Sequence, residues 1–318
     1  MNYTLHQLRI FLCVVEEESI TKAAKALFLT QPAVSIQLKK LQEQFEIPLT
    51  ERIGRRLYIT EFGYRIAEVC NRIMEANEEM ITTINQYKGL LSGRIHIAVV
   101  STGKYVMPYF LSGFVGKHPQ VNVRMDVTNK NQVIQALEDN ETDFALVSVL
   151  PQHINVETVS LMENRLHLVG NKQESSKLNQ SSLSPKDIGD LPLIFREQGS
   201  ATRMAMENFI SQNDIPLQQT LSLTSNEAVK QAVNAGLGFS IMPLIGLRNE
   251  LLNGELQLIR VSGLPMITTW TLVYREGKAL SPASRAFLDY LNEHKEALIQ
   301  RHFSWTEGLG TDNLKGNP

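Results

Sequence analysis

The sequence is poor in cysteine and has no long apolar run, and each absence excludes a class of protein. Cys13 and Cys70 are the only cysteines among 318 residues and do not form a Cys-x-x-Cys pair, which excludes a disulfide framework and a cysteine-based zinc site. We expect both thiols to be small buried hydrophobic groups. No segment approaches the roughly 18 apolar residues that span a bilayer, and the first residues lack the pattern of a signal peptide. We therefore expect a cytoplasmic protein that does not associate with membranes.

The motifs of common enzyme classes are also missing. There is no Gly-x-Ser-x-Gly elbow, no phosphate-binding Gly-x-x-x-x-Gly-Lys loop and no His-Glu-x-x-His zinc pair. The 7 histidines are scattered, and His96 lies in an apolar segment, where we expect a packed residue rather than a base. Gly236 and Gly238 do not form a dinucleotide-binding motif, because Ile241 occupies the third glycine position; they predict a turn before a strand. The sequence thus predicts no catalytic residue, no metal ligand and no resident cofactor.

Length and charge distribution indicate a multidomain protein whose N-terminal part binds nucleic acid. A chain of 318 residues exceeds what one hydrophobic core usually holds, so we expect two or three domains. Residues 22–66 contain eight lysines and arginines against four glutamates, whereas the whole chain has a net charge of −2. A basic segment on an otherwise acidic chain is typical of a domain that neutralises phosphates. A merely solvated charged face is the alternative, and it explains this segregation less well.

Residues 19–45 have the pattern of two helices joined by a tight turn, and an amphipathic helix from about Thr4 precedes them. Ser19 and Thr30 are candidate N-terminal caps, and Pro32 fits the first turn of the second helix, residues 31–45. Its apolar residues recur at steps of three and four, at Val34, Leu38, Leu41 and Phe45. Polar groups near its start suit base edges in a major groove, although any two-helix corner could share the spacing. The expected DNA contacts on the two helices are Lys22, Thr30, Gln31, Pro32, Ser35, Gln37 and Lys39.

A hairpin follows the second helix. Residues 49–60 contain two short runs of strand-forming residues around Gly54. The hairpin carries Arg52, Arg55 and Arg56, which are placed to reach phosphates or the minor groove. The helices and the hairpin together predict a winged helix-turn-helix DNA-binding domain over residues 1–63.

Residues 5–63 resemble the winged helix-turn-helix of the LysR-type transcriptional regulators. The matching pieces are LRIF at residues 8–11, SITKAA at 19–24, LTQPAVS at 29–35 and RRLYITEFG at 55–63. The resemblance implies a regulator that binds an interrupted palindromic operator in double-stranded DNA and responds to a small effector, with RNA polymerase as a further partner. Many members carry a basic residue directly after the serine of the second helix, whereas this chain has Ile36. The alternative function is an enzyme or a cytosolic ligand-binding protein with an N-terminal helical domain.

A long helix is predicted over residues 61–91, with a seven-residue apolar repeat. One series is Ile66, Ile73, Met80 and Tyr87, and the other is Cys70, Asn77, Ile84 and Leu91. This spacing is typical of a coiled-coil seam, in which the polar Asn77 would fix the register. The alternative is an amphipathic helix that lies on its own domain. The family resemblance implies a dimerising linker, residues 64–92, and a tetramer built as a dimer of dimers.

Strand and helix patterns alternate from residue 94 onward, which predicts an α/β fold. Strands are expected at 94–100, 121–127, 144–149, 193–195, 221–223, 239–242 and 269–274, and helices at 105–115, 133–137, 201–211, 226–235 and 282–299. The arrangement resembles the two-lobed, periplasmic-binding-protein-like effector domain of the family, here residues 93–303. Lobe I is expected over 93–165 and 267–303 and lobe II over 166–266, with crossovers near Arg165 and Ile267. Residues 304–318 are expected to form a flexible tail.

Hydroxyl and arginine side chains follow several of these strands and begin helices, where ligands of open α/β sheets bind. The expected ligand-binding residues are Ser101, Thr102, Ser148, Arg196, Ser200, Thr202 and Arg203. The alternative for each serine and threonine is a helix cap. Residues 196–203, REQGSATR, resemble a loop of the subgroup that controls carbon fixation or sulfur assimilation. Together these features predict a small anionic metabolite as the effector, with its identity left open.

Overall fold

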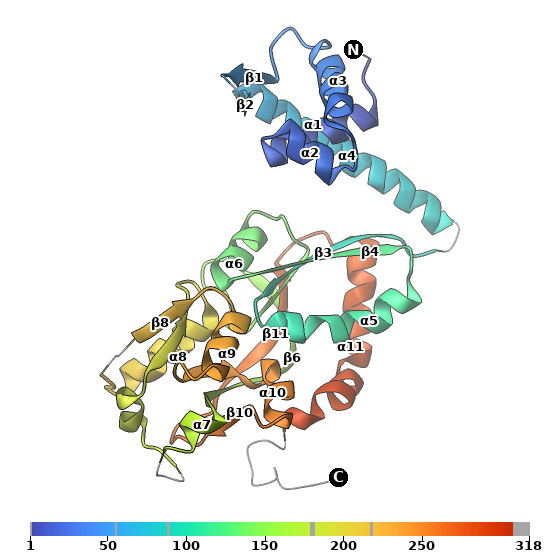
Figure 1. Ribbon diagram of the computed structural model, residues 1–318. Coiled ribbons are helices and arrows are strands. Elements are labelled where there is room, and N and C mark those ends of the chain that lie inside the picture. The colour runs from blue at the N-terminus through green and yellow to red at the C-terminus, as the bar shows by residue number, and fades with distance from the viewer. Residues whose placement is uncertain (1, 55, 88–89, 179–181, 217–218, 308–318) are drawn as a thin grey trace. The chain divides into compact units, whose positions relative to one another are not determined.

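The computed structural model describes residues 2–307 except 55, 88–89, 179–181 and 217–218 (Figure 1). The chain divides into two compact units, Met1–Gly93 and Arg94–Pro318. Among the described residues, no helix combines the length and the apolar character needed to cross a membrane. Each unit has its own hydrophobic core, as expected for a chain of this length.

The N-terminal unit is a helical bundle with a two-stranded hairpin. Its elements are α1 (Leu5–Glu17), α2 (Ile20–Ala26), α3 (Gln31–Gln42), β1 (Thr50–Ile53), β2 (Arg56–Ile59) and α4 (Glu61–Tyr87). The predicted caps are confirmed, because Ser19 accepts from the backbone N–H of Lys22 and Thr30 from that of Ala33. The buried row of α3 is Val34, Leu38 and Leu41. The helix ends three residues before the predicted Phe45, whose ring packs edge-on against Phe62.

Two residues join the helices to the hairpin. The side-chain oxygen of Gln42, the last residue of α3, accepts from the backbone N–H of Leu49 at 2.6 Å. A Cβ on Gly63, in the first turn of α4, would lie 2.1 Å from the carbonyl oxygen of Leu49, so only glycine permits this close approach. The hairpin of β1 and β2, called the wing below, is therefore held by the helices that precede and follow it.

The first half of α4 packs on its own unit, which corrects part of the predicted seam. Cys70 is only 2% exposed and lies in the core with Leu8 and Phe11, while Ile66 and Ile73 are half-buried against it. Burial raises the pKa of the Cys70 thiol, as expected for a packed cysteine. The alternative interpretation, a helix lying on its own domain, holds for this half. The second half differs, because Met80, Ile81 and Ile84 are 56, 49 and 48% exposed.

The C-terminal unit contains a seven-stranded sheet in the order β10-β6-β11-β5-β3-β4, with β9 also paired to β6. Its strands are β3 (Gly93–Val100), β4 (Val121–Thr128), β5 (Phe144–Val147), β6 (Val156–Asn171), β9 (Ser240–Pro243), β10 (Leu256–Ile259) and β11 (Met266–Arg275). A separate parallel pair consists of β7 (Leu193–Arg196) and β8 (Gln219–Leu223). The helices are α5 (Met107–Lys117), α6 (Lys130–Glu138), α7 (Lys172–Ser175), α8 (Ala201–Gln212), α9 (Asn226–Asn234), α10 (Arg248–Leu252) and α11 (Pro282–Phe303).

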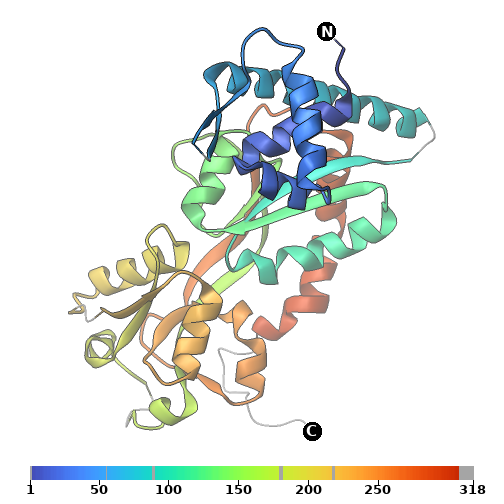
Figure 2. The ribbon, with the colours of Figure 1, turned by 45° about the horizontal axis from the view of Figure 1, so that its top comes forward.

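Two long antiparallel strands, β6 and β11, run side by side from one lobe into the other (Figure 2). Arg165 and Ile267, where the sequence predicts the crossovers, are direct partners in their register. β6 itself was not predicted, since residues 156–165 carry several polar side chains that conceal the strand pattern. The predicted turn before β9 is present, with Gly236 and Gly238 at φ values of +80° and +152°.

The end of the chain corrects the predicted tail. Residues after α11 form a short 3-10 turn, Ser304–Thr306. Within it, Trp305 packs against the apolar cluster that contains Val233 and Leu251, and the Arg248 guanidinium lies 5.4 Å from the centre of its ring. Residues 304–307 therefore belong to the folded unit. Residues 308–318 lie outside the described part of the chain.

Two histidines of the C-terminal unit, His96 and His167, are packed, as expected for His96. The His96 ring bonds the Asp126 carboxylate and the carbonyl of Glu141. His167 is 7% exposed on β6, opposite Met242 of β9. Desolvation, followed by the nearby Arg165 charge, lowers the pKa of His167 from 6.5 to about 4, because burial penalises the charged ring.

The stability of the protein should therefore fall as the pH is lowered from about 6.5 to about 4. In that range the unfolded chain binds a proton at His167 that the folded chain does not, which favours unfolding. The expected loss is on the order of 2–3 kcal/mol. Urea unfolding of the parent and of His167→Leu across this range measures it. An equal pH dependence in both proteins would show that His167 is not the source.

Candidate nucleic-acid interface and effector pocket

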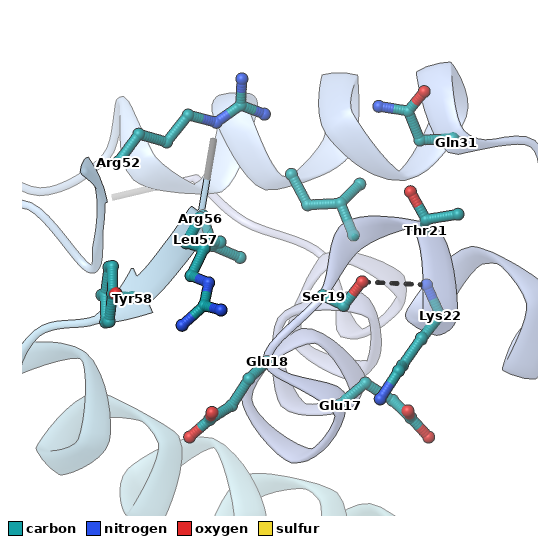
Figure 3. A pocket seen from close by; sticks show the side chains of 11 residues that line it. Glu17, Glu18, Ser19, Thr21, Lys22, Gln31, Arg52, Arg56, Leu57 and Tyr58 are labelled. Carbon is teal, nitrogen blue, oxygen red and sulfur yellow. Dashed lines mark hydrogen bonds between the residues drawn. The ribbon is translucent and has the colours of Figure 1, made fainter. Parts of the chain in front are cut away.

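An open pocket of about 600 Å³ lies between the helices and the wing of the N-terminal unit (Figure 3). Figure 3 shows Arg52, Arg56 and Tyr58 of the wing on one side and Thr21, Lys22 and Gln31 on the other. No ion pair joins Arg52 or Arg56 to a carboxylate in the part of the chain that the structure describes. Arg55 lies outside that part. Two elements far apart in sequence thus present basic and amide groups to one space.

The start of α3 is accessible, and one face of the helix stays exposed along its length. Gln31 and Pro32 are exposed, Ser35 is half-buried, and the exposed Lys39 lies 4.0 Å from Glu43. Gln37 corrects the prediction, because its side-chain oxygen accepts from the amide of the buried Gln7 at 3.3 Å. This bond holds the Gln37 side chain against α1 rather than outward. The periodicity of α3 did not reveal this contact, because Gln37 lies at the border between the buried row and the exposed face of the helix.

The second pocket lies between the lobes of the C-terminal unit. It is lined by Val100, Ser101, Thr102, Asn129, Lys130, Arg196, Ser200, Ala201 and Thr202. Five of the seven predicted ligand residues meet there, from the carboxyl ends of β3 and β7 and the start of α8. Asn129 and Lys130 were missed, although they follow the same rule, since they come directly after β4 as the cap and the first residue of α6. Helix starts supply unpaired N–H groups and a partial positive charge, which suit an anion.

The hydroxyl groups in this pocket have different roles. Ser200 is the cap of α8 and accepts from the backbone N–H of Arg203 at 3.5 Å. Thr102 and Thr202 are 5 and 8% exposed, and their hydroxyls bond no protein group among the described residues. Both residues line the pocket, so their hydroxyls are free to bond a molecule that enters it. Thr102 and Thr202 are therefore the groups of the pocket best placed to bind a ligand.

Arg196 and Arg203, which were predicted to bind the ligand, already have protein partners. Arg196 is 4% exposed, and its guanidinium bonds both carboxylate oxygens of Glu197 at 2.8 Å and the Asn226 oxygen at 2.7 Å. Arg203 bonds Glu207 and the carbonyl of Arg196. Neither Arg203 nor Ser148 lines the pocket. The charge of Arg196 is thus already neutralised, and Lys130, which bonds no carboxylate in the described residues, is the cation left at this site.

The pocket is small. Its volume of about 10 Å³ is close to the space of one water molecule. The two lobes are also joined by a hydrogen bond, which the Tyr105 hydroxyl donates to the Glu227 carboxylate at 3.1 Å. Burial and this carboxylate raise the pKa of Tyr105 to about 12, so the hydroxyl keeps its proton. A metabolite can enter only when the lobes or the lining side chains move.

The fold and these two sites define a DNA-binding transcriptional regulator with an effector-binding domain. Residues 5–64 match the family model described as bacterial regulatory helix-turn-helix protein, lysR family, and residues 88–296 match the LysR substrate binding domain. The chain belongs to the LysR family of transcriptional regulators. This membership separates it from the enzymes and solute-binding proteins that share the two-lobed fold.

Several relatives resemble almost the whole chain. The HTH-type transcriptional activator CmpR of Synechocystis sp. is 36% identical over 297 residues, which cover 93% of this chain and 97% of CmpR. The RuBisCO operon transcriptional regulator of Acidithiobacillus ferrooxidans is 36% identical over 91% of this chain and 93% of its own. Among solved structures, the Synechocystis PCC6803 CcmR regulatory domain in complex with 2-PG is 31% identical, with a TM-score of 0.61, over 64% of this chain and 97% of that domain. These relatives include regulators named for carbon fixation.

Proposed function

We propose that α3 of this regulator lies in the major groove of the operator and contacts base edges, and that the wing contacts the phosphates. The observation that carries the proposal is the pocket between the helices and the wing, to which α2 and α3 contribute Lys22 and Gln31 and the wing contributes Arg52 and Arg56 (Figure 3). Gln31 lies at the exposed start of a helix, where side chains reach base edges. The arginines carry delocalised charge, which suits phosphate. The proposed DNA-binding domain is residues 1–63, and the proposed linker is residues 64–92. The proposed effector domain is residues 93–303, here extended to residue 307.

A test compares one substitution on α3 with one on the wing. Gln31→Ala should cost on the order of 1–3 kcal/mol at one base pair of the operator and little on random DNA. Arg56→Ala should weaken specific and random DNA alike and reduce the salt dependence, because a phosphate contact releases counterions. Gel retardation at several salt concentrations, with promoter and random duplexes, measures both. If both variants lose affinity equally on every sequence, α3 is not the reading helix.

We further propose that a small anion binds between the lobes. The pocket offers the starts of α6 and α8, the cation of Lys130 and the hydroxyls of Thr102 and Thr202. Its relative CcmR has a regulatory domain solved with 2-PG, so 2-PG is the first probe to use. Thermal-shift screening with 2-PG and other small organic anions tests the proposal, since a ligand that binds only the folded state raises its apparent stability.

For assembly, we infer that two subunits pair through the second half of α4. Three large apolar side chains, Met80, Ile81 and Ile84, are exposed there, and the half-buried Asn77 lies one turn before them. Pairing would bring two DNA-binding domains to the two half-sites of a palindromic operator. The tetramer, contact with RNA polymerase and action in the cytoplasm rest on the family resemblance.

A further inference from the structure

The outward face of α3 carries an apolar side chain at its centre. Ile36 is 54% exposed. At 100° per residue, it lies roughly 140–160° around the helix axis from each member of the buried row Val34, Leu38 and Leu41. The exposed Pro32 and Lys40 stand one turn before and after it on the same face. The Ile36 side chain therefore lies at the centre of the face that would meet a groove if the helix entered one.

The fold does not explain an isoleucine at this position. Ile36 belongs neither to the buried core of the unit nor to the partly buried groups that pack on it. The exposed residues that follow it, Lys39 and Lys40, are cations, so the face as a whole suits DNA. In the major groove of DNA the one apolar group that bases present is the C5-methyl group of thymine.

We propose that Ile36 contacts a thymine methyl group and thereby makes this regulator select a T·A pair at one position of each half-site. This inference rests on the proposed insertion of α3 in the major groove. An arginine or lysine at the same place would instead pair with the acceptors of guanine or with phosphate. The chain thus replaces a charged contact by an apolar one, which adds sequence preference without adding affinity for random DNA.

Uracil substitution tests the contact directly, because uracil differs from thymine only by the methyl group. The full-length protein first selects its preferred duplex from a random library, and each thymine of one half-site is then replaced by uracil in turn. At one position the parent should lose about fourfold in affinity, the value of one buried methyl-sized group. Ile36→Ala should bind the parent duplex about fourfold more weakly and should not distinguish thymine from uracil at that position.

Two further variants complete the experiment. Ile47→Ala is the matched control, since Ile47 has the same 54% exposure in the same unit but lies outside α3; it should keep the thymine preference. Ile36→Arg should move the preferred base toward guanine and raise affinity for random DNA. Thermal unfolding should be unchanged in all three, because the replaced side chains are exposed.

The outcomes separate this inference from the proposed function. If Ile36→Ala retains the full thymine-over-uracil preference at every position, Ile36 does not read the methyl group and the inference is wrong. If Gln31→Ala also leaves sequence preference unchanged, the insertion of α3 in the groove is wrong as well. A changed preference in Gln31→Ala together with an unchanged one in Ile36→Ala overturns the inference alone.

Discussion

Replacement of Thr102 and Thr202 by alanine should abolish the response to the effector while DNA affinity without the effector stays nearly unchanged. Both residues line the pocket between the lobes, and their hydroxyls bond no protein group among the described residues. A hydrogen bond to an ionised ligand contributes roughly 1.5–3 kcal/mol, so each loss should weaken binding about 10- to 100-fold. The ligand can shift the protein only through its different affinities for two states, and unliganded DNA binding uses neither threonine.

Calorimetry with 2-PG, or with the strongest anion from the thermal-shift screen, measures the effect. Ser148→Ala is the matched control, because Ser148 follows β5 but does not line the pocket; its affinity should equal that of the parent. Operator binding with and without the anion gives the second readout. If the double variant binds the anion as tightly as the parent, the two threonines serve packing and the ligand site lies elsewhere.

Ile84→Glu should dissociate the dimer without unfolding the subunit. Ile84 is 48% exposed in the single chain, so a carboxylate there costs little until a partner covers it and leaves the charge buried without a counter-ion. Ile73→Glu should behave differently, because Ile73 packs against the core of its own unit. That substitution should lower the thermal stability of the N-terminal unit first. The two positions thus distinguish the two halves of α4.

Sedimentation velocity of the full-length variants gives the mass, and thermal unfolding gives the stability. Val69→Glu is the control, since Val69 is 40% exposed on the first half of α4 and lies outside the apolar repeat; it should keep both mass and stability. A parent-like mass for Ile84→Glu would place the subunit interface elsewhere.

Local features of this chain could be predicted from the sequence because they depend on neighbouring residues. Ser19 and Thr30 cap helices through contacts three residues away, and Gly236 and Gly238 turn the chain before β9. The rule that ligands bind at strand ends and helix starts also brought Ser101, Thr102 and Thr202 to one pocket. Each of these inferences needs only short-range pattern and a general rule of α/β folds.

Features set by tertiary partners could not be predicted. Arg196 has the residue type of an anion ligand, yet Glu197 and Asn226 already bond its guanidinium. Cys70 fits a seven-residue seam, yet it is covered by α1 of its own unit. Gln37 and Trp305 likewise have partners distant in sequence, Gln7 and Arg248. Periodicity shows which side of an element is apolar, but it does not identify what covers that side.

The position of β11 constrains how this protein is made. β11 is the last strand along the described residues, but in the sheet it lies between β6 and β5. While the ribosome has not yet released Met266–Arg275, the facing edges of β5 and β6 have no partner strand, although every other strand of the sheet has been synthesised. Open strand edges in an incomplete domain are sites of mispairing. The sheet of the effector unit can therefore close only after β11 itself has been synthesised, and until then the unpaired edges of β5 and β6 are the places in this unit where mispairing can begin.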